Sequence, residues 1–427
     1  MLIAVGLGVL ARARRWVAYA GFGVLGAVAV AAGVTRAGAG PTWALPGLVA
    51  AVAGAGLLLW LLRETDRTVD AEELEPTSRR RFLWVTGLAL AGGALGGYLA
   101  RLVNRYATVN QARDAVMLPE PVGGPAPPVP GSDVAGLTYV TPNREFYRID
   151  TAVIVPRVDP ATWELTIDGR VRRPLRLTFD ELLARPMVER YITLTCVSNE
   201  VGGDLVGNAR WLGVPVADLL DEVDPEPGAD QVVSYSVDGF TAGSPTAVLR
   251  DGRDALIAVG MNGEPLPVEH GFPVRMVVPG LYGYVSATKW LRRLHLTTFA
   301  DFDAYWIPRG WAQQAPIKTQ SRIDRPRFDE RVPAGPYVVA GVAWAQHRGI
   351  SSVQVQVDDG PWQEATLANV ASIDTWRLWS WTWHATVGRH TLRVRAADNA
   401  GQFQTEQPSF PAPDGATGYH TITVDVR

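Results

Sequence analysis

The chain has 427 residues, a net charge of -3 and 47% hydrophobic residues. This length allows two or three domains, and the charge gives no whole-chain electrostatic basis for binding nucleic acid, so we expect no nucleic acid partner. The amino-acid composition changes near residue 103. Ala, Gly, Leu and Val dominate the part before it, and the remainder has the composition of a soluble protein.

Three apolar runs in the first part are each about twenty residues long, the length needed to span a bilayer. They cover residues 16–34, 43–62 and 82–100. Arginines gather before the first run and between the second and third, so the positive-inside rule places those segments in the cytoplasm. We therefore expect a membrane domain over 1–103 in the cell membrane, with all later residues extracytoplasmic. Residues 1–10 are too short to span and could be the remnant of a longer membrane domain.

The stretch "SRRRFLW", Ser78 to Trp84, opens the third apolar run. It resembles the twin-arginine export signal, with Trp84 in place of the usual lysine. A simple cytoplasmic charge anchor is the alternative interpretation. Twin-arginine export carries proteins that are already folded, often around a cofactor, so this stretch makes a cofactor worth looking for.

The remaining chain divides into three parts by composition and periodicity. Residues 104–136 are rich in Pro and Gly and suit a semi-rigid linker. Residues 137–325 alternate short strand-like runs with short helices, such as "LTFDELLAR" capped by Thr178 or Asp180, which predicts an α+β domain without the repeats of a dinucleotide-binding fold. Residues 330–427 hold alternating strands and Asp/Asn-Gly turns, which predict an all-β immunoglobulin-like sandwich.

The single cysteine, Cys196, lies in "YITLTCVSNEVGG" after a run of strand-forming residues. A lone thiol cannot form an internal disulfide, so it is core filler, a nucleophile or a metal ligand. The histidines lack the spacing of a zinc site around it, and no local signature of a thiol protease surrounds it.

A second group of functional side chains lies in residues 261–294, where His270, Arg275 and Lys289 stand among Gly and Pro turns. Ammonium, guanidinium and backbone amides on such turns could hold a phosphate and a polar heterocycle. A solvated basic loop is the alternative interpretation.

Four motifs in order resemble the sulfite oxidase family of molybdenum enzymes. They are "FYRIDTAVIVPRVDPATWELTIDG", "LTC", "NGEPLPVEHGFPVRMVVPG" followed by "SATKW", and the C-terminal strands from "AGVAWAQHRG" to "LRVRAADNAGQFQ". The resemblance covers nearly everything from Pro142 to the end. It implies a molybdopterin-binding catalytic domain over 137–325 and an immunoglobulin-like dimerisation domain over 330–427, through which the chain could form a homodimer.

The resemblance also implies roles for individual residues. Cys196 would be the thiolate ligand of molybdenum, and a pterin dithiolene would supply two further sulfurs. The residues that would bind the molybdenum–molybdopterin cofactor are Phe146, Tyr147, Arg148, Cys196, His270, Arg275, Ser286, Thr288 and Lys289. The residues that would complete the catalytic pocket are Cys196, Arg148, Tyr305 and Arg348, the last with a surface arginine as its alternative.

One departure from the family pattern concerns the substrate. The family's cysteine is soon followed by Gly-Asn-Arg-Arg, whereas Cys196 precedes Val197, Ser198, Asn199 and Glu200. A sulfite dianion needs paired cationic donors, so the loss of both arginines favours reduction of an S- or N-oxide over sulfite oxidation. Arg210 could compensate only if the fold returns it to the pocket.

The sequence therefore predicts an anchored molybdenum oxidoreductase that transfers an oxygen atom to or from a small substrate. It has no haem attachment motif and too few cysteines for an iron–sulfur cluster, so we expect a separate electron-transfer protein or a quinone-linked membrane partner. The alternatives are sulfite oxidation proper, a cofactor-less immunoglobulin-like binding protein on a membrane stalk, and an exported enzyme that uses Cys196 as its nucleophile.

Overall fold

The computed structural model describes residues 108–427 and, before them, the isolated positions 16, 20, 24, 27, 28, 52 and 56. Apart from those positions, the predicted membrane spans and the stretch 78–84 lie outside the described residues. Among the described residues, no helix is both long and apolar enough to cross a bilayer. The chain divides into the units Met1–Ala100 and Arg101–Arg427, and the second contains both the predicted α+β domain and the predicted sandwich.

The segment expected to be a linker is held against the domain that follows it. Residues 108–114 are helical. Further along, the backbone N–H of Val122 donates to the Met187 carbonyl, and that of Ala126 donates to the Glu189 carboxylate. Leu118 packs against the main hydrophobic core. The linker thus differs from a free tether, because its few apolar side chains and backbone donors find partners on the domain surface.

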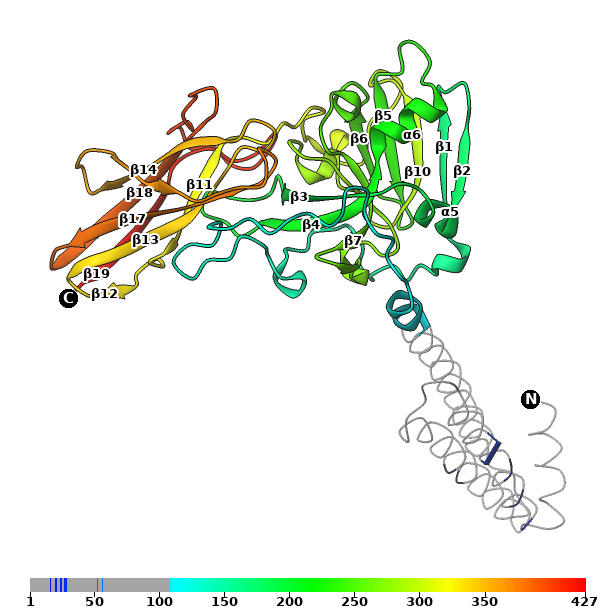
Figure 1. Ribbon diagram of the computed structural model, residues 1–427, viewed down its shortest axis with the longest axis horizontal. Helices are drawn as coiled ribbons and strands as arrows, with labels where there is room; N and C mark the ends of the chain where they lie inside the picture. The colour runs from blue at the N-terminus through cyan, green and yellow to red at the C-terminus, as the bar shows by residue number, and fades with distance from the viewer. Residues whose placement is uncertain are drawn as a thin grey trace, which may run out of the picture. The chain divides into compact units, whose positions relative to one another are not determined.

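Two sheets build the α+β domain (Figure 1). The first has the strand order β2-β1-β10-β5-β6, in which only β1 and β10 are parallel. Its strands are β1 Glu164–Gly169, β2 Leu175–Thr178, β5 Gln231–Ser236, β6 Thr241–Pro245 and β10 Leu291–Thr297. The second is antiparallel, with the order β3-β4-β7-β8 and β9 paired to β7. Its strands are β3 Val188–Thr195, β4 Val206–Pro215, β7 Leu256–Met261, β8 Glu264–Pro265 and β9 Arg275–Val277.

Short helices cover these sheets. α5 spans Phe179–Leu183, and Thr178 caps it as predicted: its hydroxyl accepts from the Glu181 N–H while the Glu181 carboxylate accepts from the Thr178 N–H. α6 spans Val216–Val223 and buries its apolar face. The single-turn 3-10 helices are η2 Asn143–Glu145, η3 Pro160–Thr162, η4 Val248–Arg250, η5 Val268–His270, η6 Gly283–Val285 and η7 Ile307–Arg309.

The C-terminal region is a β-sandwich, as its alternating strands predicted. One sheet has the order β11-β13-β17-β16 and the other the order β12-β19-β18-β14-β15. The strands are β11 Gln320–Arg325, β12 Arg331–Val332, β13 Gly335–Trp344, β14 Ile350–Val357, β15 Gln363–Glu364, β16 Thr366–Leu367, β17 Arg377–Ala385, β18 Gly388–Asp398 and β19 His420–Val426. Side chains of both sheets, including Val339, Trp379, Val394 and Ile422, form one core.

The sandwich covers the free edge of β3, the outer strand of its sheet (Figure 1). Thr193 of β3 donates its backbone N–H to the Asp374 carbonyl at 3.0 Å, and its hydroxyl accepts from the Trp376 N–H at 2.7 Å. The Gln346 amide donates to the Thr193 carbonyl and to the Thr195 hydroxyl. An exposed edge strand would leave these groups unpaired, so the contact fixes the strand that leads to Cys196.

A second contact joins the sandwich to the loop after Cys196. His420, the first residue of β19, packs so closely on Gly202 that a Cβ there would lie 2.3 Å from the imidazole Cδ2. The His420 Nδ1 accepts from the Ile323 N–H at 3.0 Å. Burial, together with the neighbouring Arg322 guanidinium, lowers the pKa of His420 to about 4. The imidazole is therefore neutral at pH 7 in the folded protein.

We predict that this histidine makes the fold sensitive to acid. Because its pKa falls from an ordinary 6.5 to about 4 on folding, the neutral form stabilises the protein above pH 6.5, and that stability is lost as the pH falls toward 4. The loss is up to about 3 kcal/mol. His420→Asn keeps an acceptor for Ile323 and should flatten the decrease between pH 6.5 and 4.5 in urea unfolding curves. His384→Asn, at an exposed site, is the control, and an equal slope in all three proteins would contradict the prediction.

Candidate active site

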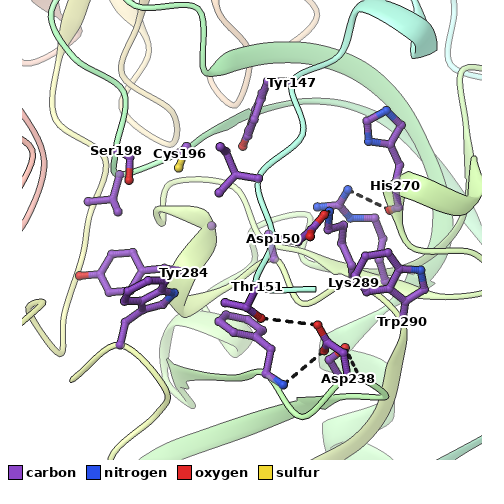
Figure 2. A pocket seen from close by; sticks show the side chains of 18 of the residues that line it. Tyr147, Asp150, Thr151, Cys196, Ser198, Asp238, His270, Tyr284, Lys289 and Trp290 are labelled. Carbon is purple, nitrogen blue, oxygen red and sulfur yellow. Dashed lines mark hydrogen bonds and ion pairs between the residues drawn. The ribbon is translucent and has the colours of Figure 1, made fainter. Parts of the chain in front are cut away.

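A cavity of about 900 Å³, counting its open mouth, lies in the α+β domain. Residues from the segment after η2, the end of β3, the β5–β6 turn and the 270–311 region line it. Figure 2 shows Cys196 and Ser198 at one side and His270, Lys289 and Trp290 at the other.

Cys196 follows β3 directly and faces this cavity. Its backbone is fixed on both sides, because its N–H donates to the Leu205 carbonyl and its carbonyl accepts from the Asn199 N–H. Burial raises the pKa of the thiol, although the N–H and hydroxyl of Ser198 lie where they would bond to the thiolate and partly oppose the shift. Without an added cation the sulfur is therefore a protonated thiol near neutral pH.

His270 and Arg275 lie together in the wall of the cavity. The His270 Nε2 lies 3.0 Å from the Asn143 carbonyl, which can only accept, so this nitrogen carries the proton and Nδ1 is an acceptor. Burial, with Arg275 nearby, lowers the pKa of His270 to about 4, so the ring is neutral. The Arg275 guanidinium donates to the His270 carbonyl and stacks 4.9 Å from the Trp211 ring centre.

Two of the predicted cations, Arg275 and Lys289, are buried, but only Lys289 forms an ion pair with a carboxylate. Arg275 has no carboxylate partner, its Nε has no hydrogen-bond partner among the described residues, and burial lowers its pKa to about 10. Burial likewise lowers the pKa of Lys289 to about 8, although an ion pair with Asp150 at 2.6 Å opposes the shift. Both side chains remain charged at pH 7 and give the site a positive interior.

Phe146 and Tyr147 line the cavity, with their rings stacked 5.2 Å apart, and their binding of a cofactor stays a prediction. Burial and the neighbouring Cys196 raise the pKa of the Tyr147 hydroxyl, so it stays protonated. Ser286 and Thr288 are fully buried behind the wall. The Ser286 hydroxyl donates to the Leu281 and Tyr282 carbonyls, and that of Thr288 pairs with the Ser234 hydroxyl, so both hydroxyls position the turn before Lys289.

Three further predicted residues, like Ser286 and Thr288, lie outside the lining of the cavity. Arg148 is half-exposed and pairs with Asp150. Tyr305 packs against Phe240 and Trp306, with the Arg309 guanidinium over its ring. Arg348 donates to Asp398, to the Ile317 carbonyl and to Thr319. Their proposed catalytic contacts remain predictions.

Nor does Arg210 return to the cavity. Its side chain pairs with Glu189 at 3.3 Å, and it is absent from the described residues that line the cavity. Glu200 is exposed and also lies outside this lining. The Asn199 side chain is buried, and its carbonyl oxygen accepts from the Leu205 N–H. The residues after Cys196 thus bring no cation to the thiol.

An aromatic wall made by Tyr284, Trp306 and Trp311 was not predicted. Trp311 lies 5.6 Å from Tyr284 and 6.2 Å from Trp306, measured between ring centres. The Tyr284 hydroxyl donates to the Ala312 carbonyl, which fixes this wall. The run "AYWIPRGW" carries a signal for this wall in its two tryptophans, although the resemblance to the family points to Tyr305 and not to Trp306 beside it.

The described residues contain no group of three or more His, Cys, Asp or Glu side chains that could hold a metal ion by themselves. A metal bound by Cys196 would therefore need further ligands from an organic group. The buried Arg275 with an unpaired Nε suits an anionic part of such a group, and the neutral His270 offers an acceptor. The residues present therefore fit a cofactor that combines soft ligands with an anion.

Comparison with known proteins gives the class of the domain. Residues 152–306 match the family model "Oxidoreductase molybdopterin binding domain". The chain is 29% identical to mitochondrial sulfite oxidase of Rattus norvegicus over 65% of its own length and 58% of that protein's. It is 28% identical to sulfite oxidase of Gallus gallus over 77% of its own length and 86% of that protein's.

These matches support a molybdopterin-dependent oxidoreductase of the sulfite oxidase type. The crystal structure of sulfane dehydrogenase SoxCD from Paracoccus pantotrophus shares the fold, with a TM-score of 0.58 and 24% identity over 69% of this chain and 85% of that one. The predicted family and enzyme class are thereby confirmed. The chain spans only 58% of the length of the mitochondrial relative, so its substrate and redox partner are matters for proposal.

We predict that Cys196 reacts slowly with alkylating reagents in cofactor-free protein. Its burial and raised pKa keep the thiol protonated, so iodoacetamide at pH 7 should modify it at least about tenfold more slowly than it modifies glutathione. The rate should rise with pH, as mass spectrometry of the intact chain would show. Rapid modification at pH 7 of the protein as isolated would instead favour an enzyme with a cysteine nucleophile.

Proposed function

We propose that this protein is a membrane-anchored, extracytoplasmic molybdenum-cofactor oxidoreductase that reduces a small, uncharged S- or N-oxide. The observation that carries the choice of substrate is the wall that faces Cys196. It contains Tyr284, Trp306 and Trp311, whereas the only cations among the described lining residues are the buried Arg275 and Lys289. Aromatic rings favour uncharged, polarisable groups such as organic sulfur, and they do not repay the desolvation of a sulfite dianion.

When bound, the molybdenum cofactor supplies a centre for two-electron transfer of an oxygen atom. Cys196 would hold the metal as a thiolate, since coordination to a cation removes the proton that burial otherwise retains. Arg275 and Lys289 would hold the anionic end, and His270 would accept a hydrogen bond through Nδ1. The aromatic wall would orient the substrate and exclude water.

For a sulfoxide, the reaction breaks the S–O bond and gives a thioether and water. It consumes two protons and two electrons, and a separate redox protein or a quinone-linked membrane partner supplies the electrons. The apolar runs and arginines of the first hundred residues support a membrane anchor with the catalytic domain outside the cytoplasm. The sandwich is the part through which we propose a homodimer.

Sulfite oxidation is the second candidate, because the relatives with printed activities include sulfite oxidases. It requires cations near Cys196 to hold the dianion. Ser198 and Val197 occupy the lining there, which favours the uncharged substrate.

The metal assignment predicts that purified full-length protein contains molybdenum and that Cys196→Ser loses at least about a thousandfold in turnover, because a hydroxyl is a poor ligand for this soft site. Metal analysis and a reduced-dye assay measure the two effects. The variant should melt within a few degrees of the wild type, which separates loss of the ligand from loss of the fold. Wild-type protein purified without molybdenum would contradict the assignment.

The substrate assignment predicts a higher kcat/KM for organic sulfoxides with reduced dye than for sulfite with an electron acceptor. Ser198→Arg places a guanidinium beside Cys196 and should raise kcat/KM for sulfite by about tenfold, the effect of one charge-assisted hydrogen bond. Ser198→Gln, which is similarly long but uncharged, is the matched control. Faster oxidation of sulfite than reduction of every oxide by the wild type would refute the proposal.

A further inference from the structure

Residues 147–155, here called the strap, cross one side of the cavity. Figure 2 shows the chain passing from Tyr147 by Asp150 to Thr151 among the pocket residues. Tyr147, Ile149, Asp150 and Thr151 all contribute to the lining. The strap contains no helix or strand, so it is a wall made of irregular chain.

Few bonds hold the strap to the domain. Within the described part of the chain, no backbone–backbone hydrogen bond joins residues 147–155 to any other residue. Val153 and Ile154 are 100% and 63% exposed. The Thr151 hydroxyl reaches Asp238 of the β5–β6 turn only at 3.5 Å, which is a weak bond. Segments with so few buried contacts open at low free energy.

Asp150 is the exception, because its carboxylate is buried in the domain. One oxygen accepts from the Lys289 ammonium at 2.6 Å and from the Arg148 guanidinium at 2.9 Å. The side chains of Asp150 and Lys289 are each only 8% exposed. Lys289 also donates to the Glu269 carbonyl, so it belongs to the body of the domain. Separating the pair would leave a buried charge unpaired, which is strongly unfavourable.

We propose that Asp150 is a positioning residue that fastens the strap over the cofactor cavity, and that the Asp150–Lys289 pair opens when the pterin cofactor enters or leaves. The inference rests on the proposed function, in which that cofactor occupies the cavity. Since the strap forms a wall and this pair is its main polar contact with the domain, opening must break this pair and the packing of Tyr147 and Val155 at the two ends of the strap. Arg148 belongs to the strap itself and holds the Asp150 carboxylate in place from the solvent side.

The test uses Asp150→Asn in the full chain, produced with and without its cofactor. Loss of the carboxylate charge should speed release of the pterin from the loaded protein by at least about tenfold, followed by pterin fluorescence after separation from the protein. In cofactor-free protein, thermolysin should cut before Val153 or Ile154 faster by a similar factor, identified by fragment mass. Asp168→Asn is the matched control, because Asp168 pairs with Arg293 and His295 outside the cavity.

If Asp150→Asn does not fold, Arg148→Gln removes only the half-exposed partner and should shift both rates in the same direction by a smaller factor. Release and cutting at the wild-type rates in Asp150→Asn would overturn the proposal. Slower pterin release from Asp150→Asn would also overturn it, because the Asp150 carboxylate would then compete with the cofactor for Lys289 and would not fasten the strap. Wild-type protein without pterin would instead refute the proposed function, and the cutting experiment does not depend on it.

Discussion

The edge of β3 is the constraint on which the site depends. That strand delivers Cys196, yet it is the outermost of its sheet, and an unpaired edge has no fixed partner for its backbone groups. The sandwich supplies those partners through Asp374, Trp376 and Gln346, all of which bond to Thr193. The position of the Cys196 thiol, three residues further along the chain, therefore depends on both domains. The contact of His420 with Gly202 also holds the loop that follows Cys196.

The cavity that this arrangement creates has two unlike regions. Around Lys289 and Arg275 it is cationic, and the burial that lowers the pKa of both groups also strengthens their attraction for an anion. Around Tyr284, Trp306 and Trp311 it is aromatic and uncharged. A cofactor with an anionic end and a metal end matches these two regions of the cavity. The proposed substrate would contact only the aromatic region.

A cavity that must take up a large cofactor needs one wall that can move. The strap suits this need because its one buried ion pair is its main polar contact with the domain and it has no backbone hydrogen bonds to it among the described residues, whereas the other walls are mostly strands and turns. Two of its apolar residues, Val153 and Ile154, remain in solvent and add nothing to closure, whereas Tyr147 and Val155 pack against the core. The backbone at Cys196 is thus held rigidly, while the strap on another side of the cavity has few hydrogen bonds to the domain.

The sequence by itself determined what depends on local pattern and on motif. It identified the strand before Cys196, the cap at Thr178, the alternating strands of the sandwich and the presence of Tyr147, His270, Arg275 and Lys289 at one site. Only the tertiary structure decided which partners the charged side chains take. Asp150 meets Lys289 across 139 positions of chain, Arg210 and Arg348 turn to other partners, and Trp306 rather than Tyr305 lines the cavity. Such choices follow from side-chain direction and from packing between distant segments, which no local pattern encodes.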